Sequence, residues 1–192
     1  MAGQTETVQS IDSAVLSLQE NLSLYPDLAW AYAYWQSKCD GRIAPRRKDI
    51  DPLEMPDILP RILLADVVST PDGDDFQYRL SGTGICDIHG QELTALRPKD
   101  LTPPPYGALI HNHYLAACRS RSPRADVIIL QTDRRARSYA RLLLPLSDDG
   151  ETINKLLAVD SEFQNDLQEF LRVIEGLQAD RVGPRMRLVR GD

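Results

Sequence analysis

The histidines and cysteines are the residues of this sequence with the greatest capacity for chemistry, and their spacing favours neither catalysis nor metal binding. His111 and His113 are two positions apart in a segment with helical periodicity, so their side chains point in different directions and do not converge on one ion. Cys39, Cys86 and Cys118 are far apart, form no metal-like pair and are interpreted as reduced thiols. The sequence contains no motif of a serine hydrolase, a zinc protease or a phosphate-binding loop. We therefore predict no catalytic residues and no metal site.

The segment 76–90 changes its period partway along, and this change suggests the wall of a pocket. Its first part, 76–80, alternates apolar with polar residues, as a strand with one buried face does. Gly82 and Gly84 then break the strand, and apolar residues follow at helical spacing over 85–89. A strand that runs through a glycine pair into a short helix can bend over its own sheet. The residues expected on the buried face of the strand are Phe76, Tyr78 and Leu80.

His113 lies at the centre of an apolar stripe, with Leu109 and Ile110, on a helix expected over 105–119. A neutral histidine hydrogen-bonded inside the core is the preferred interpretation, and a polar contact with a bound molecule is the alternative. His89 lies on the short helix after the glycine pair. For that residue a solvent-facing or capping role is preferred over a place in a pocket.

Periodicity and turn signals divide the chain into blocks of helices and strands. A helix capped by Ser10 is expected to run to Leu22, and a second helix to run from Pro26 to Gly41. The further expected elements are strands at 62–69 and 76–80, a helix at 105–119, strands at 125–132, 136–146 and 153–160, and a helix after a capping box at 161–164. A hairpin and a three-stranded meander predict one antiparallel sheet with helices across one face, which is an α+β fold.

The strand expected at 136–146 alternates between two kinds of side chain. Its even-numbered residues, including Ala140 and Leu142, are expected to point into the protein, whereas Tyr139 and Arg141 are expected to point outward. A pocket on the inner side of this strand would therefore be lined by small and aliphatic side chains.

The composition bounds the class of protein. The chain has 192 residues, of which 42% are hydrophobic and 26% charged, and these values are ordinary for a globular protein. The net charge of -6 argues against nucleic acid as a partner. No apolar run approaches the length that spans a bilayer, and the polar first residues do not resemble a signal peptide. We therefore expect a cytoplasmic protein without a nucleic-acid or membrane partner.

The order of these elements, together with five short motifs, resembles a PAS domain. The resemblance is closest to a bacterial subgroup of short, stand-alone PAS proteins known mainly from alphaproteobacteria. The motifs, in the expected order, are Tyr34-Trp35, Ile43-Ala44-Pro45-Arg46, Asp49-Ile50-Asp51-Pro52, Leu59-Pro60 and Tyr78-Arg79-Leu80-Ser81-Gly82-Thr83. The chain departs from the family pattern at Ala95, where the family usually has glycine, and at Ser81, where an apolar residue is more common.

The resemblance implies a PAS-like five-stranded antiparallel sheet with a helical flank over a cavity, to which N-terminal and C-terminal helices are added. We expect an N-terminal tail and helix at 1–27, the PAS-like domain at 28–162, and a C-terminal helix and tail at 163–192. The resemblance also implies frequent dimerisation and a sensory or regulatory role. It implies no particular ligand or cofactor, because a fold does not determine a function.

The cavity implied by the resemblance would lie between the sheet and the helices at 83–119. The residues expected to line it are Tyr78, Ile85, Ile88, His89, Leu109, His113, Ala140 and Leu142. Some haem-binding PAS domains ligate iron through a histidine on the corresponding helix, so haem ligation by His113 is a further alternative, without a second haem-specific feature. Trp30 and Tyr34 share a face of helix 26–41 that is separate from its main apolar stripe, and they are the expected dimer face.

Two functions of different classes fit this sequence. The first is a non-catalytic sensory or regulatory PAS module that binds a small molecule, a protein partner or both in signal transduction. The second is a ligand-free interaction or dimerisation domain, in which large side chains such as Tyr78 and Leu142 fill the cavity. No feature of the sequence argues for an enzyme.

Overall fold

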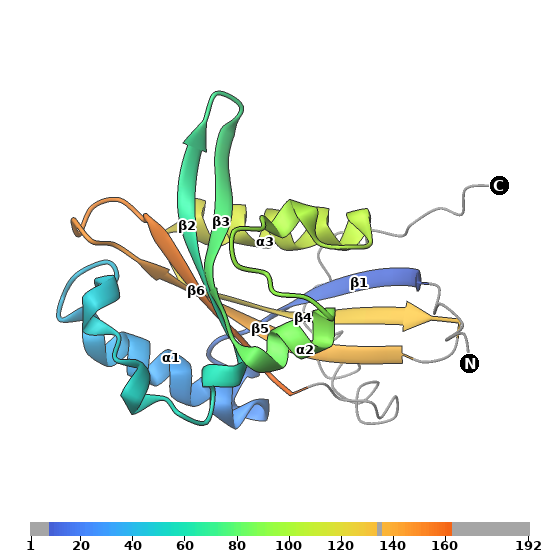
Figure 1. Ribbon diagram of the computed structural model, residues 1–192. Coiled ribbons are helices and arrows are strands. Elements are labelled where there is room, and N and C mark those ends of the chain that lie inside the picture. The colour runs from blue at the N-terminus through green and yellow to red at the C-terminus, as the bar shows by residue number, and fades with distance from the viewer. Residues whose placement is uncertain (1–7, 134–135, 163–192) are drawn as a thin grey trace.

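A six-stranded antiparallel sheet forms the centre of the molecule (Figure 1). The computed structural model describes residues 8–133 and 136–162. The strands are β1 (Val8–Leu16), β2 (Ile62–Thr70), β3 (Gly73–Ser81), β4 (Arg124–Thr132), β5 (Ala136–Leu146) and β6 (Lys155–Asp160). They lie in the order β1-β4-β5-β6-β2-β3, so the β2–β3 hairpin pairs with the β4–β5–β6 meander through β2 and β6. The hairpin and the meander predicted from the sequence are confirmed.

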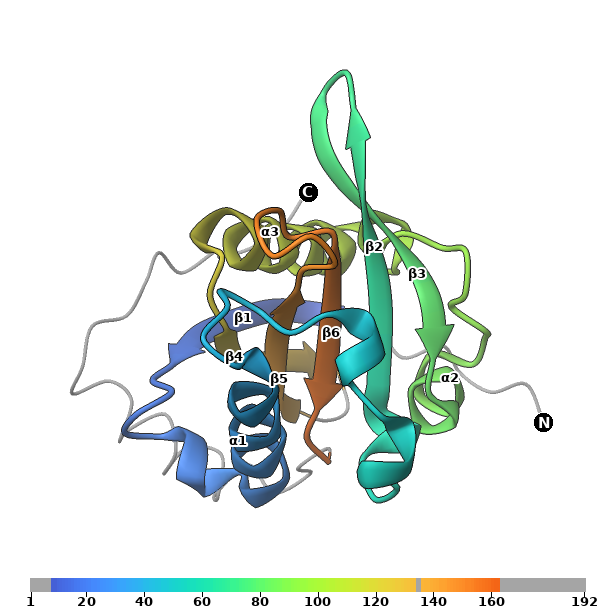
Figure 2. The same ribbon diagram turned by 90° about the vertical axis from the view of Figure 1, so that its left-hand side faces the viewer.

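Within the described residues, three α-helices flank the sheet. They are α1 (Pro26–Cys39), α2 (Thr83–His89) and α3 (Pro104–Ser120), and five single-turn 3-10 helices lie at Leu22–Leu24, Arg47–Asp49, Pro52–Glu54, Leu59–Arg61 and Pro98–Asp100. Figures 1 and 2 show α1 and α3 on different sides of the β4–β6 part of the sheet. We call these two sides the α1 face and the α3 face. The helix predicted after the capping box lies outside the described residues.

The sixth strand is a correction to the helix expected from Ser10 to Leu22. That segment instead forms β1, which pairs along β4 from Val8 opposite Thr132 to Leu16 opposite Ala125. Its apolar residues do not alternate with polar ones as in a half-buried strand, so periodicity indicated a helix although the segment pairs as a strand. Pairing with β4 supplies partners for backbone groups that would otherwise lie at an open sheet edge.

Both faces of β5 are buried, which corrects the expected orientation of this strand. On the α3 face, the hydroxyl of Tyr139 lies 2.6 Å from that of Tyr106 on α3. On the α1 face, the indole nitrogen of Trp35 on α1 donates to the carbonyl oxygen of Pro145 at 2.7 Å. Alternation then places Tyr139 and Arg141 toward α3, and Ala140 and Leu142 toward α1. With helices on both sides, the contrast between polar and apolar residues does not indicate which side is which.

A bulge in β3 corrects the expected position of Leu80. Ala65 pairs with Tyr78 but Leu64 pairs with Leu80, so Arg79 is an extra residue in this strand. Tyr78 therefore faces α3, whereas Leu80 turns to the α1 face, where it lines an apolar groove and is 38% exposed. Simple alternation along 76–80 did not reveal this change.

The glycine-containing bend after β3 is confirmed. Strand β3 ends at Ser81 and α2 begins at Thr83, so Gly82 lies between the two elements. A side chain at Gly82 would collide with the backbone carbonyl oxygens of Leu59 and Pro60. The bend therefore requires glycine because the preceding linker passes directly beneath it, and α2 is held against that linker.

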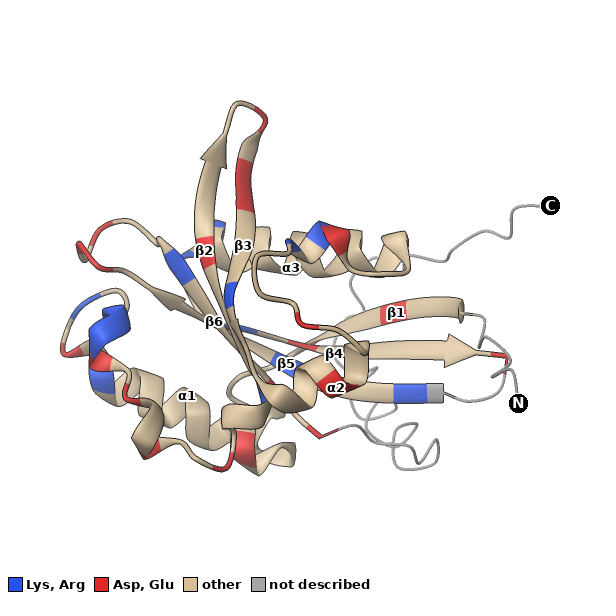
Figure 3. Ribbon diagram, viewed as in Figure 1, with Lys and Arg blue, Asp and Glu red and all other residues tan. Residues whose placement is uncertain are grey.

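Charged side chains concentrate at loops and short helices, as Figure 3 shows. The segment 42–48 is basic, and it is bonded to neighbouring carboxylates and backbone groups. The guanidinium of Arg42 lies 2.8 Å from Asp49, and the Arg47 backbone N–H donates to Asp148 in the β5–β6 loop at 3.1 Å. The bond to Asp148 attaches this segment, which follows α1 in the chain, to the β5–β6 loop of the meander.

The backbone conformation of Ala95 explains why glycine is usual at this position in the family. Its φ is 71°, in the left-handed region that favours glycine, while its N–H donates to the carbonyl of Tyr78 at 2.8 Å. The loop between α2 and α3 is thereby attached to β3 through an alanine in a strained conformation.

Replacing Ala95 with glycine is expected to stabilise the protein by ~0.5–1 kcal/mol, because the relief of left-handed strain exceeds the added entropy of the unfolded chain. Urea unfolding followed by circular dichroism measures the change. Ala33→Gly, at an exposed position inside α1, is the matched control and should destabilise the protein by about 1 kcal/mol. Equal losses in the two variants would contradict strain at Ala95.

Candidate functional site

A layer of polar side chains is buried between α3 and the sheet. We call it the Arg141 cluster, and its members are Tyr78, Tyr106, Tyr114, Tyr139, Arg141 and Asp160. All six side chains are at most 4% exposed. They come from β3, α3, β5 and β6, so the cluster forms only when the sheet and its flanking helix meet.

The ion pair of Arg141 and Asp160 is the centre of the cluster. The two residues face each other on β5 and β6, and two parallel bonds join them, Nε to Oδ1 at 2.6 Å and Nη2 to Oδ2 at 2.7 Å. Burial disfavours the charged guanidinium and by itself would lower the pKa of Arg141. The Asp160 carboxylate has the larger net effect, so the pKa of Arg141 lies well above its ordinary value. Nη1 of Arg141, in contrast, makes no hydrogen bond within the described parts of the chain.

The four tyrosines of the cluster form two pairs with different hydrogen bonding. The hydroxyls of Tyr106 and Tyr139 are 2.6 Å apart, and the Arg141 guanidinium lies 5.4 Å from the centre of the Tyr139 ring. The rings of Tyr78 and Tyr114 meet edge to face at 6.1 Å and their hydroxyls interact with each other, but neither hydroxyl makes a hydrogen bond of ordinary geometry among residues 8–133 and 136–162. Burial raises the pKa of Tyr78 and of Tyr114, so both hydroxyls keep their protons.

Three polar atoms of the cluster therefore lack partners in the described structure: Nη1 of Arg141 and the hydroxyls of Tyr78 and Tyr114. The charge of Arg141 opposes the effect of burial on the pKa values of Tyr78 and Tyr114, and all three side chains belong to the same buried layer. A buried polar atom without a hydrogen bond destabilises a protein by about 1–3 kcal/mol, and native structures contain few of them. Three at one place are therefore an unusual concentration of unsatisfied polar groups.

His113 lies beside the cluster, between α3 and the strands β1 and β4. Its Nε2 is 3.3 Å from the Ser13 hydroxyl on β1, and its Nδ1 is 3.7 Å from Oδ2 of Asp126 on β4. Burial, more than any nearby charge, lowers its pKa from 6.5 to about 4, so the ring is neutral at pH 7. A buried neutral histidine is the interpretation that the sequence favoured. Ligation of haem through Nε2 would require this ring to leave Ser13.

Ser13, His113 and Asp126 have the order of a catalytic triad but not its geometry. Arg124 occupies both oxygens of Asp126, at 2.5 and 2.6 Å, and the 3.7 Å separation leaves Nδ1 of His113 without a hydrogen bond. The carboxylate therefore does not orient the imidazole through a hydrogen bond, and burial outweighs its favourable effect on the pKa of His113, whereas nucleophilic catalysis requires an oriented and charge-stabilised base. This arrangement gives no support for a hydrolase.

The other predicted pocket residues divide into two groups. Ile85 and Leu109 are buried, and the His89 ring lies 6.1 Å from that of Tyr106, so His89 borders the cluster. Burial lowers the pKa of His89, with a smaller contribution from Arg141. Ile88 is 45% exposed and does not join this group.

Ala140 and Leu142 are corrections, because they lie on the α1 face of the sheet. The residues that the sequence analysis missed are Tyr106, Tyr114, Tyr139, Arg141 and Asp160. One signal could have found the ion pair. Counting outward from the turn between β5 and β6 pairs Arg141 with Asp160, which are opposite charges on neighbouring strands.

The two expected dimer-face residues stack on the outer side of α1. The Trp30 and Tyr34 rings are 5.3 Å apart and inclined by 11°, and Trp30 is 44% exposed. The Tyr34 hydroxyl donates to Glu54 at 2.6 Å. The predicted dimer stays a prediction.

Neither a membrane-spanning helix nor a metal-binding group of side chains is found in the described ranges 8–133 and 136–162. Neither α1, α2 nor α3 is long and apolar enough to span a bilayer. No group of three or more His, Cys, Asp or Glu side chains in these ranges is placed to hold a metal ion.

Comparisons with known proteins agree with this architecture. A family model described as "PAS domain" matches residues 25–159, which is more than half of the chain. The chain therefore belongs to the PAS domain family, whose members are generally non-catalytic sensory modules in signalling.

One similar solved structure is the PAS domain of BvgS from Bordetella pertussis, which is 15% identical. The match covers 69% of this chain and 100% of that chain, with a TM-score of 0.46. No curated protein matches the chain.

The depressed pKa of His113 predicts a pH dependence of stability. The unfolded chain takes up a proton near pH 6.5 and the folded chain only near pH 4, so the free energy of unfolding falls as the pH drops between these values. The loss from this residue is on the order of 3 kcal/mol, and stability from it is constant below that window. Asp126, Arg124 and Arg141 are the charged groups that act on the ring.

Urea unfolding of the wild type and of His113→Gln at pH 7 and pH 4.5 measures this effect. We expect the variant to lose much less stability on acidification than the wild type. His111→Gln is the comparison, because the His111 side chain is 19% exposed against 7% for His113. This variant should change the pH dependence of the free energy of unfolding less than His113→Gln does. Parallel slopes for the wild type and His113→Gln would contradict a neutral, buried His113.

Proposed function

We propose that this protein is a non-catalytic sensory PAS module in which the Arg141 cluster binds a small molecule. One observation carries the proposal: Nη1 of Arg141 and the hydroxyls of Tyr78 and Tyr114 are buried together without partners in the described chain. A molecule that accepts hydrogen bonds from these groups would remove the free-energy penalty of leaving them unpaired.

The chemistry of these groups indicates the kind of ligand. Nη1 of Arg141 is a donor and the two hydroxyls can both donate, so the complementary group is an acceptor oxygen such as a carbonyl. Asp160 already balances the charge of Arg141, and Arg124 balances Asp126. An uncharged ligand therefore fits the site better than an anion, whose desolvation no unpaired cation of the cluster would compensate.

A ligand bound in the Arg141 cluster would also affect the α1 face of the sheet. Arg141 and Tyr139 lie on the same strand as Pro145, whose carbonyl holds Trp35 on α1. A ligand that shifts β5 against α3 therefore also shifts the contact of β5 with α1. We propose that this coupling carries the signal to a partner protein or to a second copy of the chain through Trp30 and Tyr34.

The alternative function is a ligand-free interaction domain. The specific observation in its favour is the density of the interior, since Tyr78, Tyr114 and Leu109 between the sheet and α3 are 0%, 0% and 8% exposed. In that case water molecules would form hydrogen bonds with the unpaired groups, and the outer surface of α1 would be the functional site. The bacterial and cytoplasmic settings expected from the sequence accompany both functions as predictions.

Native mass spectrometry of the purified protein, with an absorption spectrum of the same sample, separates the two functions. We expect a retained small mass that is lost in the double variant Tyr78→Phe/Tyr114→Phe. Leu142→Met is the matched control, because it conserves volume on the α1 face and should keep the ligand. If the bare chain alone is found, even after incubation with a metabolite extract, the ligand-free function is supported and the sensory proposal fails.

The unpaired hydroxyls also predict an unusual response to substitution in the ligand-free protein. Tyr78→Phe and Tyr114→Phe should each raise the free energy of unfolding by about 1 kcal/mol, because each removes a buried group without a partner. Tyr106→Phe is the matched control and should lower it by a similar amount, since the Tyr106 hydroxyl is bonded to Tyr139. Destabilisation of similar size in all three variants would mean that the hydroxyls are already paired, and the proposed site would be excluded.

A further inference from the structure

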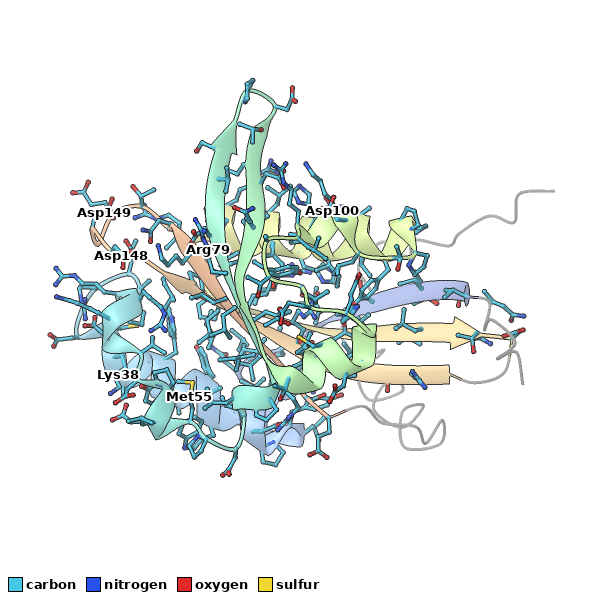
Figure 4. All side chains as sticks on the ribbon, in the orientation of Figure 1. Lys38, Met55, Arg79, Asp100, Asp148 and Asp149 are labelled. Carbon is cyan, nitrogen blue, oxygen red and sulfur yellow. The ribbon has the colours of Figure 1, made fainter. Side chains whose placement is uncertain are left out.

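A small pocket on the outer surface of α1 is separate from the Arg141 cluster. It lies between α1 and the segment 54–58 and has a volume of about 170 Å³. Its floor is apolar, with Met55 and Ile58 at 3% and 4% exposure, and Trp30 is its exposed aromatic wall. Figure 4 shows Met55 and Lys38 at this side of α1.

The wall of the pocket is held in place before any partner binds. Trp30 stacks on Tyr34, whose hydroxyl donates to Glu54 at 2.6 Å. The ammonium of Lys38 lies 2.7 Å from the same carboxylate and 4.8 Å from the centre of the Tyr34 ring. These contacts fix the indole of Trp30 and one carboxylate of the rim, so little order has to be gained on binding.

The rim of the pocket is acidic. Asp27, Glu54 and Asp57 line it, and two of the three are balanced: Asp27 by Arg61 at 2.5 Å and Glu54 by Lys38. Asp57 is exposed and forms no hydrogen bond or ion pair in the described part of the chain. The pocket therefore carries one uncompensated negative charge beside an aromatic face.

We propose that this pocket binds an arginine side chain presented by a partner protein. The volume is below the roughly 300–1,000 Å³ of sites for drug-sized molecules, and it suits a single side chain. A planar guanidinium can stack on the Trp30 indole while it donates to the Asp57 carboxylate, and its aliphatic stem can cover Met55. Lysine is a poorer match because its compact, strongly hydrated ammonium does not stack.

Arginine and tryptophan are also the residues that most often dominate the energy of protein interfaces. The occupant is therefore identified by charge and shape, and a second copy of this chain is the competing occupant. The pocket and the Arg141 cluster share no residue, so the two proposals can fail independently.

The experiment titrates the peptide acetyl-Gly-Arg-Gly-amide into the ¹⁵N-labelled full chain and follows the indole N–H resonances. The chain has two tryptophans, and Trp30→Phe assigns them. We expect the Trp30 resonance to shift with a millimolar Kd, whereas Trp35, which is bonded to Pro145 inside the protein, should not move. The peptide with citrulline in place of arginine has the same shape without the charge. We expect its affinity to be lower by at least ~5-fold.

Variants test the role of the charge. Asp57→Asn should weaken binding of the arginine peptide ~5-fold without loss of stability, and Asp87→Asn, an exposed carboxylate on α2, should leave binding unchanged. Equal binding of the arginine and citrulline peptides, or no effect of Asp57→Asn, would overturn the proposal. Light scattering that shows a dimer abolished by Trp30→Ala would assign the surface to a second copy of the chain and would also overturn it.

Discussion

The bidentate ion pair between Arg141 and Asp160 is the constraint on which the arrangement of the interior depends. Both side chains are almost wholly buried, at 1% and 3% exposure, and each would be strongly unfavourable there without the other. Because the partners lie opposite each other on β5 and β6, a one-residue slip of these strands would leave two buried charges unpaired. The pair therefore specifies the register of the meander and places a cation beneath α3.

The tyrosines of the Arg141 cluster follow from that placement. Tyr139 packs its ring against the guanidinium and bonds to Tyr106, so α3 is tied to β5 through polar as well as apolar contacts. Tyr78 and Tyr114 complete the layer with their rings and leave their hydroxyls unpaired in the described structure. An interior of this kind is specific in shape but incompletely satisfied in hydrogen bonding, a state that a bound molecule can change. A sensory role within the PAS family is consistent with such an interior.

Much of the fold could be predicted from the sequence. The β2–β3 hairpin, the bend at Gly82, α3 and the three-stranded meander were predicted from local period and turn residues. The site could be predicted less well, because its members were assigned by which face of a strand looked apolar. That criterion failed for Ala140 and Leu142, since helices cover both faces of β5. It also failed for Leu80, since the bulge at Arg79 reverses the alternation.

The sequence by itself determined the α+β class, the order of most elements and the position of the bend after β3, because each depends on residues close together in the chain. It also indicated a neutral, buried His113 through the apolar stripe of its helix. Only the tertiary structure decided that residues 8–16 form a strand, that Arg141 is inside and that its charge is balanced by Asp160. The physical reason is that the stability of a buried charge or of an edge strand depends on a partner from elsewhere in the chain, whose position local periodicity does not specify.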